Sequence, residues 1–354
     1  MSSCDVGMRQ SRVKAAVATL NPGYFALVMA TGMVSIGVRN QDRTTVSEAL
    51  LWVALAGYGV LVVLTGWRAV AFPARLRADF ADPRRGFGFF TFVAGTDVLG
   101  ARLALDGHHR IALVLLAVGF LGWIVLGYVV PWTAVLGRVD RPVIADANGT
   151  WFIWAVASQS VAVLAAALEP TFSTGRRELA LLAVFSWSVG VFLYAAAGIF
   201  VAARLLLYPL SPADLTPPYW VAMGATAITV LAGARIVQMA DAPIVTATRG
   251  LVAGASVVFW AFGTWLIPPL VAAGWWRHVT HRIPLRYEAT WWSIVFPLAM
   301  YGVAGHYLGN ADHLPIVAAI GHGEFWVALI AWGLTFTGLL QHLRHTLIRQ
   351  NDRP

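Results

Sequence analysis

The stretch IALVLLAVGFLGWIVLGYVVPWTAVL, residues 111–136, runs for 26 residues without a charged side chain. A helix needs about 20 mostly apolar residues to cross the ~30 Å hydrocarbon core of a bilayer. This stretch is therefore long enough and apolar enough for a complete crossing. It predicts a membrane-spanning helix and places the whole chain among the integral membrane proteins.

The composition of the chain agrees with that assignment. Of its 354 residues 58% are hydrophobic and 12% are charged, whereas a soluble domain carries about 25% charged residues. So few charges exclude a cytosolic enzyme, a disordered chain and a secreted disulfide scaffold. The single cysteine, Cys4, provides no intramolecular disulfide and no Cys-based metal site.

Ten stretches qualify or nearly qualify as membrane spans, and clusters of Arg, Asp, Pro or Gly separate them. Because the connections are short, successive helices are expected to be antiparallel neighbours, with no second folded domain. We expect a cytoplasmic segment at 1–20, a transmembrane domain at 21–345 and a cytoplasmic tail at 346–354. The predicted spans lie near 22–38, 49–67, 87–104, 111–136, 149–168, 179–207, 218–238, 250–274, 289–308 and 314–340.

The predicted spans alternate in character. Even-numbered spans are mostly long and dense in Leu, Val and Ala, whereas odd-numbered spans are mostly shorter, with more Gly, Thr and Ser. This alternation favours an all-α membrane protein of five helical hairpins, each pairing a lipid-facing helix with an inner one.

Lys and Arg in the loops set the orientation. The N-terminus, alternate loops and the C-terminus carry 17 Lys and Arg with 8 Asp and Glu, whereas the other loops carry 8 with 9. The first side is net +9 and the second −1, which predicts a multi-pass protein of the inner (cell) membrane with both termini cytoplasmic. The net charge of +8 would suggest nucleic acid on a soluble protein. Here it reports orientation, and no nucleic-acid partner is expected.

Small residues gather in the odd-numbered spans, where they could leave a lumen at mid-membrane. Membrane helices also use such residues to pack closely, so both interpretations stay open. The candidates for lining a pore are Thr31, Gly32 and Ser35 in the first span, Gly95, Thr96 and Asp97 in the third, and Gly224 in the seventh.

Asp97 is the exceptional residue of the third span. It lies about ten residues past the start of that span, or ~15 Å at 1.5 Å per residue, which is close to the bilayer midplane. An ionisable group at that depth is costly and is a functional candidate. The alternative is a carboxyl group that is neutral or paired across helices and serves structure alone.

The ninth span carries a proline inside a predicted helix, in the sequence Phe296-Pro297. Proline removes one helical hydrogen bond and should kink the helix. Phe296 would then be directed toward whatever that helix faces.

Four cationic or titratable residues lie at or near the exits of odd-numbered spans: Arg39, Arg102, Arg235 and His306. They could form a cationic collar around an outer mouth. Snorkelling of long side chains to the headgroups is the alternative explanation.

Three motifs together resemble the tellurite-resistance/dicarboxylate-transporter family of the voltage-dependent anion channel superfamily, which includes the slow anion channels of plant guard cells. The resemblance covers nearly the whole chain. The motifs are Pro22-Gly23-Tyr24-Phe25 with Thr31-Gly32-Met33-Val34-Ser35, Asn148-x-Thr150-Trp151, and Trp291-Trp292-Ser293-x-x-Phe296-Pro297.

The resemblance implies five hairpins in a quasi-fivefold arrangement around a central pore, and a homotrimer with one pore in each subunit. It also implies that Phe296 is the phenylalanine that plugs the pore. Asp97 departs from this pattern, because a fixed carboxylate repels anions unless it is protonated, paired or turned away from the lumen.

Three functional hypotheses follow. The first is an anion channel or facilitative exporter for chloride, nitrate, a dicarboxylate or an oxyanion such as tellurite, with Phe296 as the gate. The second is a proton-coupled C4-dicarboxylate carrier of the malate type, in which Asp97 binds the proton. The third is a membrane enzyme or haem protein. The sequence has no His-Glu-x-x-His motif and no P-loop, so we expect neither catalysis nor a cofactor.

Overall fold

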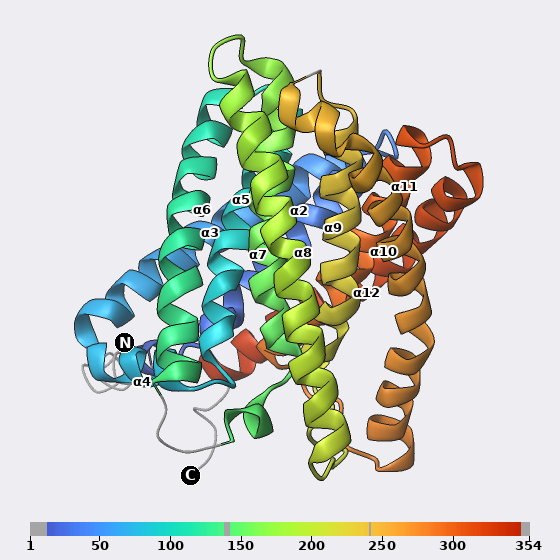
Figure 1. The fold of residues 1–354 in the computed structure, drawn as a ribbon. Helices are drawn as coiled ribbons and strands as arrows, with labels where there is room; N and C mark the ends of the chain where they lie inside the picture. The colour runs from blue at the N-terminus through green and yellow to red at the C-terminus, as the bar shows by residue number, and fades with distance from the viewer. Residues whose placement is uncertain (1–12, 138–141, 241, 348–354) are drawn as a thin grey trace, which may run out of the picture.

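The computed structural model describes residues 13–137, 142–240 and 242–347. Most of the predicted N-terminal segment 1–20 and of the tail 346–354 lies outside these ranges. Within them the chain is all-helical and contains no strand. The long helices run side by side (Figure 1). They are α2 (Ala26–Arg39), α3 (Thr44–Ala71), α5 (Phe90–Leu105), α6 (His109–Val130), α7 (Phe152–Leu168), α8 (Arg176–Leu207), α9 (Val221–Val237), α10 (Pro243–Trp275), α11 (Trp292–Ala311) and α12 (Pro315–Leu347), and the short α4 (Pro73–Ala81) follows α3.

The long helices form an inner and an outer set. The inner helices α2, α5, α7, α9 and α11 contact one another in that order, and α11 returns to contact α2. Each inner helix also packs against the outer helix that follows it in the chain. Burial follows the same division, because 89% of the apolar window of α7 is buried, against 22% for that of α8. The Gly-rich and Leu-rich spans alternate in the sequence because buried inner helices alternate with exposed outer helices along the chain.

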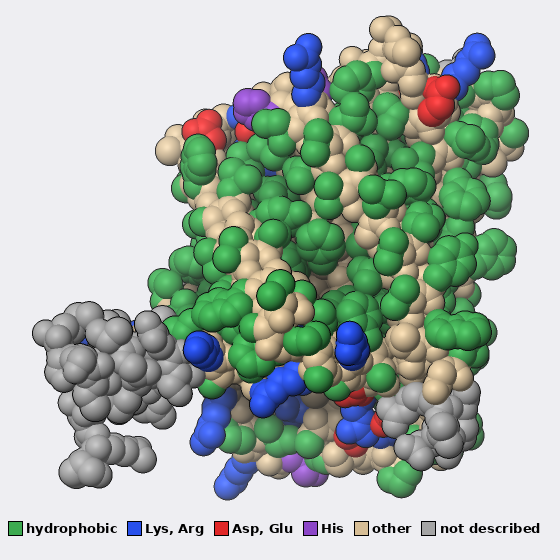
Figure 2. All heavy atoms as spheres, turned by 90° about the vertical axis from the view of Figure 1, so that its left-hand side faces the viewer, with side chains coloured by type: hydrophobic (Ala, Val, Ile, Leu, Met, Phe, Trp, Pro, Cys, Tyr) green, Lys and Arg blue, Asp and Glu red, His purple; other side chains and the backbone are tan. Residues whose placement is uncertain are grey.

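Eight of the described helices are long and apolar enough to cross a membrane. The inner helices α2 and α11 are not among them, although the sequence predicts a span at each place. Both lie inside the bundle, where protein rather than lipid surrounds them. On the face drawn in Figure 2, hydrophobic side chains cover the middle of the molecule, and charged groups gather toward its two ends. The chain is an all-helical membrane protein.

Every inner helix begins with a short 3-10 turn. These turns are η1 (Pro22–Phe25), η2 (Gly86–Phe89), η5 (Gly149–Trp151), η7 (Pro217–Trp220) and η9 (Ala289–Trp291). Asparagine side chains cap two of them. The side chain of Asn21 accepts a hydrogen bond from Gly23 N, and that of Asn148 accepts one from Thr150 N, both at 2.8 Å. The inner helices therefore start at one end of the bundle, in five repeats of the same local structure.

Candidate functional site

A cavity of about 320 Å³ lies where the five inner helices begin. We call it the vestibule. Helix N-termini carry a partial positive charge and unpaired N–H groups, which favour anions. All five inner helices or their 3-10 turns contribute to its wall, through Gly23, Thr91, Thr150, Tyr219 and Ser293 among others.

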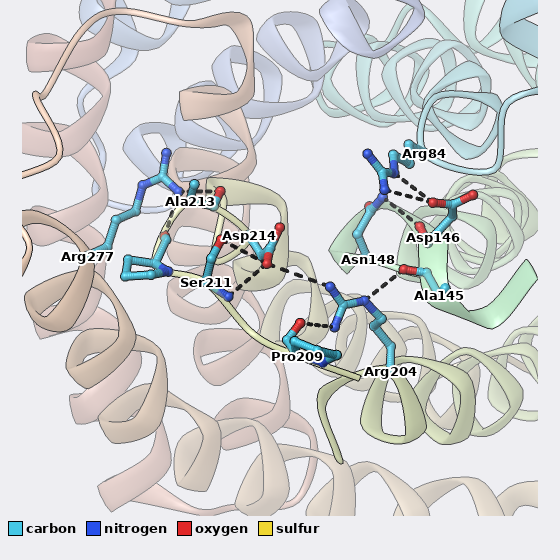
Figure 3. A network of polar contacts seen from close by, with 11 residues as sticks. Arg84, Ala145, Asp146, Asn148, Arg204, Pro209, Ser211, Ala213, Asp214 and Arg277 are labelled. Atoms are coloured by element: carbon cyan, nitrogen blue, oxygen red, sulfur yellow. Dashed lines mark hydrogen bonds and ion pairs between the residues drawn. The ribbon is translucent and has the colours of Figure 1, made fainter. Parts of the chain in front are cut away.

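Charged side chains from the adjoining loops complete the vestibule (Figure 3). Arg84 pairs with Asp146, with 2.8 Å between Nη2 and Oδ1. Arg204, near the end of α8, donates to the carbonyls of Ala145 and Pro209. These contacts join the loops that precede α7 and α9.

Arg277 fixes the same loop from a different side. It lies in the π-helical turn η8 (Trp276–Thr280) that follows α10. Its guanidinium donates to the carbonyls of Pro212 and Ala213 at 3.0 and 2.7 Å (Figure 3). The loop before α9 is therefore held by arginines from two outer helices.

A second and much smaller cavity, of about 20 Å³, lies farther along the same five helices. We call it the axial cavity. It can hold about one water molecule. Its wall is mostly apolar and includes Met33 of α2, Val98 of α5, Val163 of α7, Leu231 of α9 and Met300 of α11.

Phe296 lies between the two cavities. Ser293 lines the vestibule and Met300 lines the axial cavity. Residues 293, 296 and 300 are spaced by three and four, so they share one face of α11. Phe296 is 1% exposed. Its neighbour Pro297 packs instead against α9, because a Cβ added to Gly224 would lie 2.8 Å from Pro297 Cγ.

Asp97 lines the axial cavity but is held away from its centre. Its Oδ2 accepts a hydrogen bond of 2.8 Å from the hydroxyl of Ser160 on α7. Its Oδ1 has no hydrogen-bond partner and abuts α6, since a Cβ added to Gly119 would lie 2.0 Å from it. The carboxyl group thus sits between an inner and an outer helix, at the edge of the axis.

Gly119→Ala should therefore destabilise the protein. The added methyl group would displace the Asp97 carboxyl group, and overpacking of this kind costs about 1–3 kcal/mol. Gly127→Ala in the same helix is the matched control, because its Cβ would meet only Trp154 Nε1 at 4.0 Å. Thermal unfolding in detergent should show a lower midpoint for the first variant alone. Equal midpoints would contradict the placement of Asp97.

The four residues of the predicted collar have different surroundings. Arg102 is fully buried and donates to the hydroxyls of Ser35 and Ser47 at 2.8 and 2.9 Å. Its Nη1 also pairs with Asp106 Oδ2 at 2.6 Å. Arg39 approaches the same carboxylate less closely, with 3.9 Å between Nε and Oδ1.

Only Arg235 of these four lines the axial cavity. Its guanidinium lies 4.2 Å from the ring centroid of Tyr307 and donates to the Tyr307 hydroxyl. His306 is half-buried and lies 3.2 Å from the amide of Asn310. Arg235 is thus the one cation of the collar that faces the axis.

The small residues predicted to line a pore are engaged in helix packing. Thr31 accepts a hydrogen bond from Trp332 on α12, and Thr96 bonds to Tyr58 on α3. Cβ atoms added to Gly32, Gly95 and Gly224 would lie 2.7–3.3 Å from Val98, Phe25 and Pro297. Ser35 belongs to the Arg102 cluster. None of these six residues lines either cavity. Their contacts are those expected of small residues that let membrane helices pack closely.

Asp97 and Arg235, which the sequence singles out, line the axial cavity, but its apolar lining residues were not predicted. They are ordinary apolar side chains, so their composition carries no signal. Their positions repeat at three- and four-residue intervals on each inner helix, and that spacing is the signal that would have selected them. On three helices they are Met33 and Ile36, Val98 and Ala101, and Met300 and Val303.

Comparison with known proteins agrees with this architecture. A family model described as "Voltage-dependent anion channel" matches residues 19–340. An uncharacterized membrane protein of Mycobacterium tuberculosis (strain ATCC 25618 / H37Rv) is 71% identical over 159 residues, which cover 45% of this chain and 81% of that protein. An uncharacterized transporter of Methanocaldococcus jannaschii is 26% identical over 326 residues, or 89% of this chain and 90% of that protein. The matched region covers nine of the ten long helices completely and most of α12, and this chain belongs to the voltage-dependent anion channel family.

Proposed function

We propose that the protein is a passive conduit for small anions. The path runs from the vestibule, past Phe296, into the axial cavity and on to Arg235. Ten spans, arranged as five hairpins with quasi-fivefold symmetry, surround this path. Phe296 blocks it at rest and opens it by rotating away from the axis.

The observation that carries this proposal is the alignment of two cavities along the same five helices, with one buried aromatic side chain between them. The wall beyond Phe296 is mostly apolar, which suits a constriction that excludes water until it opens. Helix N-termini at one end and Arg235 at the other offset part of the cost of dehydrating an anion.

The proposed pore lining differs from the small residues first considered. Thr31, Gly32, Ser35, Gly95, Thr96 and Gly224 hold the inner helices together, and the lumen is lined by their apolar neighbours. Among the collar residues, Arg235 contributes to the anion path, and Arg39, Arg102 and His306 stabilise the surrounding helix ends.

We place the vestibule on the cytoplasmic side of the inner membrane, since the loops at that end and the two termini carry 17 of the 25 Lys and Arg residues. The assembly we propose is a trimer with one path in each subunit.

Flux into proteoliposomes tests the function directly. Chloride, nitrate, malate and tellurite should be compared, each with and without a pH gradient. The proposal expects flux of at least one of these anions down its concentration gradient, with no need for a pH gradient. Absence of flux for all four, in both wild type and the Phe296→Ala variant, would refute it.

A proton-coupled carrier is the second candidate, and Asp97 favours it. Asp97 lines the axial cavity that Arg235 also lines, and its Oδ1 has no hydrogen-bond partner. Such a group could take up a proton as an anion binds nearby.

Asp97→Asn separates the two candidates. The conduit predicts that this variant keeps at least about half of the anion flux, because an amide can replace the carboxyl group as the hydrogen-bond partner of Ser160. A carrier predicts uptake driven by a pH gradient in the wild type and its loss in the variant. Asp42→Asn, at an exposed loop position, controls for the change in net charge.

A further inference from the structure

Arg204 is fixed in place while one of its donor groups stays unused. Its Nε donates to Ala145 O at 2.8 Å and its Nη1 to Pro209 O at 3.1 Å. Its Nη2 faces Asp214 across 3.7 Å, which is beyond hydrogen-bond distance (Figure 3). The side chain is 12% exposed and lines the vestibule. It is therefore a preorganised cation with free hydrogen-bonding capacity.

Asp214 is bound to its own loop more closely than to Arg204. Its Oδ2 accepts hydrogen bonds from the N–H and the hydroxyl of Ser211, at 2.8 and 2.9 Å. These bonds hold the pKa of Asp214 below its usual value, with the backbone N–H as the main cause. The group is thus charged at neutral pH, and its side chain is 41% exposed.

Arg84 and Asp146 form a second pair at the vestibule, in direct contact at 2.8 Å, unlike Arg204 and Asp214. They form an ion pair in which the arginine side chain is 68% exposed. Exposed ion pairs of this kind are weak and exchange readily with dissolved ions. Both carboxylates therefore stand beside guanidinium groups at the place where an anion would enter.

A third ion pair near the vestibule behaves differently. Arg68 and Asp79 are 2.6 Å apart with side chains 3% and 8% exposed, and Arg85 approaches Asp79 from the vestibule side at 3.1 Å. No dissolved anion reaches this pair without unfolding the segment around α4. The two pairs that line the vestibule and the buried pair thus have separate roles, exchange and structure.

We propose that Arg204 and Arg84 form an anion-recruiting site in the vestibule, and that Asp214 and Asp146 compete with the incoming anion for it. This inference rests on the proposed function and adds the regulation of its entrance. The ligand is a small planar oxyanion or carboxylate, because the flat guanidinium fork matches that geometry. Each carboxylate acts as a tethered competitor and raises the anion concentration needed to fill the site.

The test uses nitrate flux measured against nitrate concentration on the vestibule side of proteoliposomes. Asp214→Asn should lower the half-saturating concentration by about two- to fivefold, the range that an exposed ion pair represents. The maximum flux should stay the same, since Phe296 limits it. Arg204→Gln should raise the half-saturating concentration. Arg204→Lys, which keeps the charge but loses the planar fork, should have an intermediate effect.

Two controls separate this inference from the function on which it rests. Asp312→Asn changes the net charge equally but lies at the end of α11 opposite Ser293 and the vestibule, so it should leave the half-saturating concentration unchanged. Nitrate-dependent thermal stabilisation of purified protein reports binding without flux. It should be stronger for Asp214→Asn than for wild type and weaker for Arg204→Gln.

The outcomes are distinct. If Phe296→Ala conducts nitrate but Asp214→Asn keeps the wild-type half-saturating concentration, the recruiting site is refuted and the conduit stands. If no variant conducts nitrate but the thermal shifts follow the expected order, the site stands and the conduit fails. An equal decrease of the half-saturating concentration in Asp312→Asn would also refute the recruiting site, because the change in net charge alone would then explain the result.

Discussion

Replacing Phe296 with alanine should open the path and raise anion flux by about tenfold or more. Phe296 is buried on the face of α11 that also carries Ser293 of the vestibule and Met300 of the axial cavity. A barrier lowered by only ~1.4 kcal/mol already gives a tenfold increase, and an apolar constriction closed by a whole aromatic ring is expected to exceed that. Current in planar bilayers or flux into proteoliposomes measures the effect.

Two further variants make this result interpretable. Phe296→Ala removes a packed aromatic side chain, which costs about 3–5 kcal/mol of stability, so Phe296→Leu should give a smaller increase in a better-folded protein. Phe152→Ala deletes a buried ring of the same size from α7. The ring of Phe152 packs against Tyr194 of the outer helix α8, with 5.3 Å between the ring centroids. That variant should lose stability without gaining flux. Equal gains in both alanine variants would point to leakage through damaged protein.

Replacing Arg102 with methionine should destabilise the protein by about 2–3 kcal/mol, because it removes the charge-assisted hydrogen bonds of a fully buried guanidinium. Arg102 joins three helices, because it contacts Ser35 of α2, Ser47 of α3 and Asp106 at the end of α5. Its loss leaves two buried hydroxyls and a carboxylate without their donor. Chemical unfolding in detergent measures the difference.

The comparison with the other arginines of the predicted collar decides the interpretation. Arg39 is 37% exposed and 3.9 Å from Asp106, so Arg39→Met should cost less than about 1 kcal/mol. Arg235→Met should change anion flux more than stability, since Arg235 lines the axial cavity. If Arg102→Met instead unfolds like Arg39→Met while altering anion selectivity, Arg102 belongs to the mouth of the path after all.

The helices and their burial were predictable because they follow from one-dimensional patterns. Apolar length identifies the long outer helices, and the Gly-rich composition of the others reflects close packing inside the bundle. The proline inside α11 is a local feature, and it occurs where the sequence places it.

The directions of the side chains were harder to predict. Thr31 and Met33 lie two residues apart on α2, yet the first bonds to α12 and the second faces the axial cavity. The role of Arg102 depends on Ser47 and Asp106, which come from other parts of the chain. Such roles depend on how each helix is rotated about its axis and on which helices surround it. The composition of a helix contains no information about either.

The most direct test of the account is a cysteine-accessibility experiment on the proposed path. The chain has one cysteine, Cys4, so a Cys4→Ser, Phe296→Ala background provides an open path without other thiols. Ser293→Cys and Met300→Cys are then introduced separately at the two cavities. Val63→Cys, on the lipid-exposed side of α3 where Val63 is 67% exposed, is the control.

Each variant is treated with a small anionic methanethiosulfonate reagent while anion flux is recorded. The account predicts that modification of the Ser293→Cys and Met300→Cys variants blocks flux, and that modification of the Val63→Cys variant leaves it unchanged. Complete modification at positions 293 and 300 with undiminished flux would contradict an anion path along the axis of the five inner helices.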